Sequence, residues 1–290
     1  MSYSAFILIA FSGIMHAVYN LLIKQSRNKT VFIWWMFSWS TALFSTLLPF
    51  LPGPFTMPDA EIMILAAAGA FCFVLYHLFT GRAYSCGDLS LTYPLTQTSI
   101  VYVPFWGVMM LGEQLSRTGL GGILVVFAGG YLLQMRRAST QELLRPFGSL
   151  VEPSVQAAFA AGFVYSLGAI VDKIGVSSYP PLYFTYLLVV AMLALMTANI
   201  LRPRYRSRII TEWRDSRRLI LVGGPLMMSS FISFRYGLSL SPMSYAVPVR
   251  QMSIVAGVLI GTMILGESCV RIRLTASFLI LAGIFFIRLG

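Results

Sequence analysis

A segment of 20 residues occurs twice in this chain, and this repetition restricts the possible fold more than any other feature. The segment from Pro94 to Glu113 returns 154 positions later, from Pro248 to Glu267, in the same ungapped register. Ten of the 20 aligned positions are identical. Apolar composition could account for the shared Ile, Val and Leu residues, but not for the shared Pro, Gln, Ser and Gly-Glu. The chain is therefore a duplication, and each half carries an apolar helix that a proline breaks near its start.

The composition places the chain in a membrane. Hydrophobic residues make up 57% of the 290 and charged residues 11%, whereas a soluble domain has roughly 25% charged residues. The net charge of +11 could suggest nucleic acid, but the basic residues lie between apolar runs, so we expect no nucleic-acid partner. The three cysteines, Cys72, Cys86 and Cys269, have no paired spacing. We therefore expect no disulfide framework, no metal site and no cofactor.

Ten apolar runs are long enough to cross a bilayer, which takes about 20 residues. The longest polar connection between them runs from Arg136 to Pro153 and leaves five on each side. The fold class that we expect is all-α integral membrane, with ten transmembrane helices in two inverted five-helix repeats. The expected repeats are 1–137 and 154–290, joined by a linker at 138–153. The predicted spans are 3–23, 31–51, 60–80, 89–111, 118–135, 154–174, 181–201, 218–237, 243–265 and 272–288.

The distribution of positive charge predicts the orientation. Basic residues concentrate in the connections that follow odd-numbered spans, and seven arginines lie between Arg202 and Arg218 alone. Positive residues stay on the cytoplasmic side, so we expect a multi-pass protein of the inner (cytoplasmic) membrane with both termini outside. The segment Arg202–Arg218 is expected to lie against anionic lipid headgroups. The protein is expected to be a monomer or a homodimer.

The chain resembles the drug/metabolite transporter superfamily and, within it, the EamA-type members. The resemblance rests on the duplicated five-span plan, on Gly87–Pro94, on the endings Met110–Glu113 and Ile264–Glu267, and on the small residues late in the fifth and tenth spans. It implies a central cavity lined by helices one to four and six to nine, with helices five and ten as outer supports. Small multidrug exporters of this superfamily resemble one another in a glutamate on the first helix, which this chain lacks.

Arg250 is the most informative candidate for substrate binding. It follows Pro248 by two residues and lies about 10 Å into the ninth span, at 1.5 Å per residue. A charge at that depth costs about 2.5–3.5 kcal/mol on the lenient insertion scale. A guanidinium can bind a carboxylate through two parallel hydrogen bonds, so a role in binding an anionic group is expected. The alternative is a structural pairing with helix carbonyls or with a distant acid.

Gln97 and Gln251 are the repeat-related amides that follow the two prolines. Proline frees a carbonyl in the preceding turn, so each amide could bind either the substrate or that carbonyl. In the first span, His16, Tyr19 and Asn20 share one helix face because of their i, i+3, i+4 spacing. His16 is also a candidate for proton coupling, because histidine titrates near neutrality. Further candidates for lining the cavity are Tyr93, Tyr165 and Tyr245.

The remaining charged residues are expected to have structural or surface roles. His77, Arg82 and Arg235 lie near span ends, where long side chains reach the headgroups. Asp172 and Lys173, at the end of the sixth span, are expected to face water. Glu113 and Glu267 are expected to cap helix ends.

These observations predict a secondary transporter, and an exporter in the first instance, that works by alternating access. No span except the sixth carries an acid in its interior, and the ninth span carries Arg250. The expected cargo is therefore a small carboxylate-bearing or zwitterionic metabolite. An amino-acid derivative or an opine-type metallophore would be of this kind. One alternative is a facilitator or importer of a phosphorylated or phosphonate-like metabolite. The other is an intramembrane enzyme, for which the sequence offers no nucleophile–base or metal motif.

Overall fold

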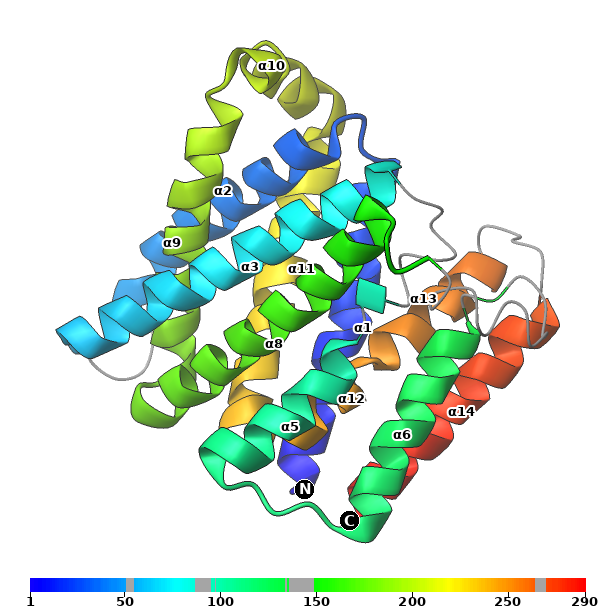
Figure 1. Ribbon diagram of the computed structural model, residues 1–290. Helices are drawn as coiled ribbons and strands as arrows, with labels where there is room; N and C mark the ends of the chain where they lie inside the picture. Colours follow the sequence, from blue (N-terminus) through cyan, green and yellow to red (C-terminus); the bar gives the residue numbers. More distant parts are fainter. Residues whose placement is uncertain (51–54, 87–94, 97, 134, 136–148, 264–269) are drawn as a thin grey trace.

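The described part of the chain folds into α-helices, and it contains no strand (Figure 1). The computed structural model describes residues 1–290 except 51–54, 87–94, 97, 134, 136–148 and 264–269. The helices are α1 (Tyr3–Gln25), α2 (Lys29–Leu47), the 3-10 helix η1 (Leu48–Phe50), α3 (Ala60–Cys86), α5 (Ser99–Leu111), α6 (Arg117–Leu132), α8 (Pro153–Ser178), α9 (Pro181–Ile200), α10 (Pro203–Arg206), α11 (Ile209–Ser239), α12 (Met243–Arg250), α13 (Met252–Met263) and α14 (Val270–Leu289).

Local sequence explains where several of these helices begin. The side chains of Ser2, Asn28 and Ser116 each accept a hydrogen bond from the backbone N–H three residues on, at 3.2, 3.2 and 2.9 Å. Such caps satisfy backbone donors that the first turn leaves without a partner. Helices α8, α9 and α10 instead have proline in the first turn, where its missing N–H costs nothing.

Eight segments are long and apolar enough to cross a membrane, and two more are apolar but shorter. The shorter ones are α5 and α6, which correspond to the predicted fourth and fifth spans. Part of the fourth span, including Tyr93 and Gln97, lies outside the described residues. The all-helical membrane fold is confirmed, whereas the count of ten full spans stays a prediction. The long helices are Tyr3–Gln25, Lys29–Phe50, Ala60–Ala83, Pro153–Ser178, Pro181–Ile200, Ile209–Ser239, Met243–Ile260 and Arg271–Leu289.

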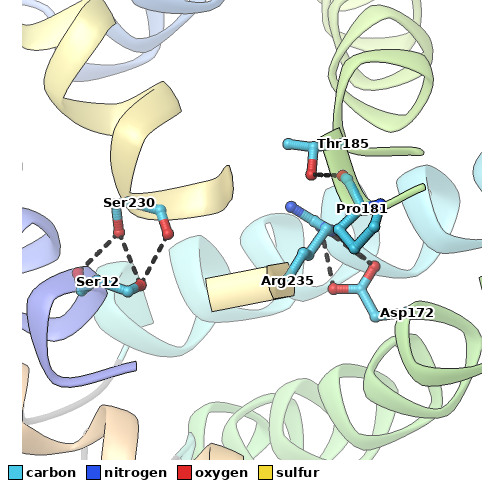
Figure 2. Close-up of polar contacts among 6 residues, drawn as sticks. All are labelled: Ser12, Asp172, Pro181, Thr185, Ser230 and Arg235. Carbon is cyan, nitrogen blue, oxygen red and sulfur yellow. Dashed lines mark hydrogen bonds and ion pairs between the residues drawn. The ribbon is translucent and has the colours of Figure 1, made fainter. Parts of the chain in front are cut away.

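The helices of the two halves pack against each other reciprocally. The first helix of each half packs along the third helix of the other, which makes the two extensive pairs α1–α11 and α3–α8. In the same way α2 packs on α11, and α9 packs on α3. At the α1–α11 contact, the hydroxyls of Ser12 and Ser230 each donate to the other's carbonyl oxygen at 2.8 Å (Figure 2). Repeat-equivalent helices thus pack against equivalent helices of the other half, which is the packing expected of two inverted repeats.

Helices α6 and α14 lie side by side at the edge of the bundle (Figure 1), as the resemblance implied for the fifth and tenth helices. Glycine allows their backbones to approach closely. A Cβ atom at Gly122 would lie 2.6 Å from the Gly283 carbonyl oxygen, and one at Gly129 would lie 2.9 Å from the Ala276 carbonyl oxygen. Without a hydrophobic drive between helices in lipid, such close packing is what holds a transmembrane pair together.

The chain ends lie together, away from the arginine-rich segment. The Arg288 guanidinium donates to the Met1 carbonyl oxygen at 3.0 Å, and α10 lies at the opposite end of the bundle (Figure 1). The segment Arg202–Arg218, expected as a connection, forms α10 and the first turns of α11, which begins nine residues before the predicted span. Glu212 anchors this extension, because its carboxylate accepts from the Asn28 backbone N–H at 2.8 Å.

The Gly-Glu pair that closes the first copy of the repeat joins the two halves. Gly112 ends α5 with a φ of 65°, a left-handed conformation that glycine adopts at little cost. The Glu113 carboxylate then accepts hydrogen bonds from the Met243 and Ser244 backbone N–H groups at 2.6 and 3.0 Å. Glu113 is therefore a capping residue, as predicted, and the helix that it caps is α12 of the other half. Glu267 lies outside the described residues.

Candidate functional site

A cavity of about 580 Å³ lies between the two halves. Its wall includes the second half of α1, central turns of α3 and α8, the last third of α11 and the junction between α12 and α13. The described residues that line it include His16, Tyr19, Asn20, Lys24, Phe73, Tyr76, His77, Thr96, Ser99, Tyr165, Asp172, Phe231, Arg235, Arg250, Gln251, Ser253, Gly257 and Arg273.

The break in the ninth span places Arg250 in this cavity. Pro248 lies inside α12, the helix ends at Arg250, and α13 starts at Met252. The Arg250 guanidinium stands over the Phe234 ring, 4.3 Å from its centroid, a favourable cation–π geometry. Among the described residues, no carboxylate lies within ion-pair distance of it. The break also brings Gln251, the residue between the two helices, to the cavity wall.

The polar face predicted on the first helix borders the cavity. Tyr19 and His16 are joined by a hydrogen bond of 2.5 Å between the phenol oxygen and Nδ1, and Asn20 lies beside them on the wall. Tyr165 contributes from α8, with its ring packed against those of Phe73 and Tyr76 at centroid distances of 5.8 and 5.3 Å. Four predicted residues from two repeat-related helices therefore meet at one site.

Tyr245 does not belong to this group. Its ring is buried, with Gly119 of α6 against it, and its hydroxyl accepts from the Ser116 backbone N–H at 2.9 Å. The prediction that Tyr245 lines the cavity is thus wrong, because the N-terminal turn of α12 points it toward the α5–α6 connection. Tyr93 and Gln97 lie outside the described residues, so their placement stays a prediction.

A buried ion pair in the cavity wall was not predicted. Figure 2 shows the Asp172 carboxylate of α8 against the Arg235 guanidinium of α11. Nη2 lies 3.1 Å from Oδ1 and 3.0 Å from Oδ2, and Nε lies 3.3 Å from Oδ1. The side chains are only 2% and 5% exposed. Asp172 therefore does not face water, and Arg235 does not reach the headgroups. The sequence did carry a signal for this pair, namely an acid inside one predicted span and an arginine inside another. Charges buried in a protein are paired.

Two more expectations about charged residues need correction. Lys173 does not face water freely, because its Nζ donates to the carbonyl oxygens of Leu238 and Ser241, both at 2.9 Å. His77 lines the cavity instead of reaching the headgroups, and its ring packs against Tyr76 at a centroid distance of 5.1 Å. Both residues lie farther inside the bundle than their distance from the span ends indicated.

The charge of the cavity is predominantly positive. Of its described lining residues, four are basic and Asp172 alone is acidic. The acid is paired with Arg235, and the other basic residues of the described lining are Lys24, Arg250 and Arg273.

A cavity at a helix break, enclosed by two repeats of membrane-spanning helices, defines a membrane solute transporter. The comparisons with known proteins agree. The sequence model of the EamA-like transporter family matches residues 3–135 and 153–289, and the chain belongs to this family of the drug/metabolite transporter superfamily.

Among solved structures, 29 chains match. One of them, titled "Crystal structure of protein", is superposed with a TM-score of 0.72 at 17% sequence identity, over 99% of this chain and 98% of the other. At that identity the likeness shows the fold alone. A search of the curated proteins found no match.

Proposed function

We propose that this transporter exports a small polar metabolite that carries a carboxylate, such as an amino-acid derivative or an opine-type metallophore, by alternating access. The observation that carries this proposal is the Arg250 guanidinium, which lines the cavity without a carboxylate partner among the described residues. A cation in the membrane interior is costly unless an anion or water compensates it. The cargo would supply that anion during transport.

The cavity wall also offers uncharged hydrogen-bonding groups for the rest of such a molecule. Gln251 and Asn20 present amides, and Tyr165 presents a phenol. A volume of about 580 Å³ lies within the roughly 300–1,000 Å³ of small-molecule sites. Amides and a phenol suit the amine or hydroxyl of a zwitterionic compound. His16, held by Tyr19, is our candidate for a proton-coupling residue within this site.

A phosphorylated metabolite is the second candidate, and the basic side chains in the cavity wall favour it. Lys24, Arg250 and Arg273 all line the site, and lysine and arginine both bind phosphate. An intramembrane enzyme receives no such support, since members of the EamA family are transporters.

Solute exchange in proteoliposomes tests the proposal. Purified protein would be reconstituted with unlabelled solute inside, and uptake of labelled L-glutamate, L-lysine and glucose 6-phosphate would be measured. We expect saturable counterflow of the carboxylate that Arg250→Ala lowers at least about 100-fold, because the loss of a charge-assisted contact costs about 2.7 kcal/mol or more. Arg250→Lys keeps the charge but not the bidentate geometry, so it should restore activity only in part.

The matched control is Arg217→Ala, which removes an exposed arginine of α11 and should leave exchange unchanged. Exchange of glucose 6-phosphate alone would replace the carboxylate proposal by the phosphate one. Equal activity of Arg250→Ala and the unaltered protein would contradict both.

A further inference from the structure

The two ends of the cavity differ, although the repeats that form them are related. Lys24 and Lys173 occupy equivalent positions, 149 residues apart in the two first helices. Lys24, in the last turn of α1, lines the cavity, as does Arg273 near the start of α14. The cavity thus extends to the end of the bundle at which α1 ends. Lys173 is not part of the lining, and its ammonium is bound to two carbonyl oxygens at the end of α11.

Polar contacts join α8 to α11 at the other end. The Asp172–Arg235 ion pair forms part of the cavity wall, and the bonds of Lys173 to Leu238 and Ser241 lie one residue further along α8. Because α8 packs extensively on α3, and α11 on α1, these contacts connect the two large helix pairs of the molecule. We call Asp172, Lys173 and Arg235 the α8–α11 latch.

We propose that the α8–α11 latch is the gate at this end of the cavity, and that Asp172 is a proton-binding site whose occupation opens it. The inference depends on the proposed function only in requiring alternating access, and it does not involve the nature of the cargo. A proton from the water at this end would bind a carboxylate oxygen of Asp172 and turn the carboxylate into a neutral acid. Arg235 keeps its own proton, since guanidinium is not deprotonated in proteins.

Protonation removes the charge that holds Arg235. Both Asp172 oxygens face the guanidinium, at 3.0 to 3.3 Å. A neutral acid can still accept a hydrogen bond from Arg235, but the attraction between opposite charges is lost. The other described contact of Arg235 is the Phe231 ring, 5.7 Å from its centroid. An unpaired guanidinium in a buried site is unfavourable, so α11 would move to bring Arg235 to water. The helix pairs α1–α11 and α3–α8 would then separate at this end.

The surroundings of Asp172 identify the groups that could compete for the proton or modify its effect. From α11 the carboxylate meets Arg235, and Arg250 at the end of α12 lines the same cavity. On α3, Cys72 packs against Gly168, one helical turn before Asp172. His16 of α1 and His77 of α3 line the same cavity, and Lys173 follows Asp172 in the chain. Asp172 is the single acid among the described lining residues.

Accessibility of a cysteine in the cavity measures the gate directly. Gly257 lines the cavity, and a Cβ atom there would have no neighbour within 4 Å, so Gly257→Cys adds a reactive thiol without displacing anything. The background carries Cys72→Ser, Cys86→Ser and Cys269→Ser. A membrane-impermeant maleimide would be added to the face that carries the chain termini, at neutral pH and at about pH 5. Because maleimide reacts with the thiolate, which is scarcer in acid, each labelling rate is expressed relative to that of free cysteine at the same pH.

We expect slow labelling at neutral pH and faster labelling in acid. Asp172→Asn removes the ionisable group, so it should raise the labelling rate at neutral pH about tenfold. A modest change in the gate equilibrium produces a population shift of this size. Asp172→Asn should also abolish the pH dependence. His16→Gln and His77→Gln should keep the pH dependence. The matched control is Glu212→Gln, which neutralises another buried carboxylate, near the other end of α11, and should behave like the background.

Two results would overturn the inference. One is a labelling rate in the unaltered latch that does not change with pH, and this measurement needs no latch variant to fold. The other is an Asp172→Asn protein with intact helical structure that labels as slowly as the background. Because the assay contains no cargo, Arg250→Ala should still label faster in acid. A failure of the carboxylate proposal would therefore leave the gate result standing, and a failure of the gate would leave the cargo result standing.

Discussion

Gly13 and Gly162 lie at equivalent positions of the two repeats, and each contacts the interrupted helix of the opposite half. A Cβ atom at Gly13 would lie 3.0 Å from the Arg250 carbonyl oxygen and 3.1 Å from the Ser253 backbone nitrogen. One at Gly162 would lie 3.2 Å from the Ser99 backbone nitrogen, and Ser99 is the repeat equivalent of Ser253. The first helix of each half therefore supports the break in the fourth helix of the other, where the candidate binding residues are located.

A larger side chain at Gly13 should disturb the site. We expect Gly13→Val to shift the backbone at Arg250 and to lower exchange about tenfold or more, since overpacking of this kind costs about 1–3 kcal/mol. Counterflow in proteoliposomes measures the effect. Gly81→Val is the control, because a Cβ atom at Gly81 meets nothing within 4 Å. Equal losses in both variants would show that helix propensity, and not the contact with Arg250, is responsible.

Removal of the Glu113 carboxylate should weaken the connection between α5 and α12. Glu113→Ala leaves the Met243 and Ser244 N–H groups at the start of α12 without their acceptor. We expect a loss of about 1–2 kcal/mol of stability, the usual value of a helix cap with a favourable charge. Thermal unfolding in detergent, followed by tryptophan fluorescence, would detect it. Glu152→Ala should have no comparable effect, because Glu152 precedes α8 without making a side-chain cap.

The α6–α14 contact should tolerate a side chain at one glycine and not at its neighbour. Gly122→Val would place atoms within 2.8 Å of the α14 backbone, whereas a Cβ atom at Gly121 meets nothing within 4 Å. We expect Gly122→Val to lower the stability of the protein by about 1–3 kcal/mol. Gly121→Val should lower it only by the intrinsic cost of valine in a helix. The unfolding temperatures of the two variants in detergent, compared with that of the unaltered protein, measure this difference. A similar drop in both would contradict the packing described for α6 and α14.

The charge distribution predicts that both chain ends face away from the cytoplasm. An alkaline phosphatase domain fused after Gly290 should then be active, because the enzyme matures only outside, and green fluorescent protein at the same place should be dark. Fusions after Arg206 in α10 should show the reverse pattern. Fluorescence from the C-terminal fusion would show the opposite orientation, and it would place the end of the cavity that Lys24 lines on the outside.

The membrane class and the repeat could be read from the sequence because both depend on local properties. Transfer of an apolar run into lipid depends on that run alone, so most helices lie within a few residues of the predicted spans. The Pro248–Gln251 pattern likewise indicated the helix break, since proline acts on the turn that precedes it. His16, Tyr19 and Asn20 came to one cavity wall because helical spacing determines which residues share a face.

The tertiary structure decided which of those residues meet. Asp172 and Arg235 are 63 positions apart, and their pairing depends on the rotation of α8 and α11 about their axes, which no local pattern records. The same holds for Tyr245, whose ring is buried against α6 because α12 begins at the Glu113 cap. Apolar content and helical period are properties of a segment, and they determined that this chain forms a duplicated membrane bundle. Contacts between helices are properties of the whole packing, and they determined which charges line the cavity and which hold one end of it closed.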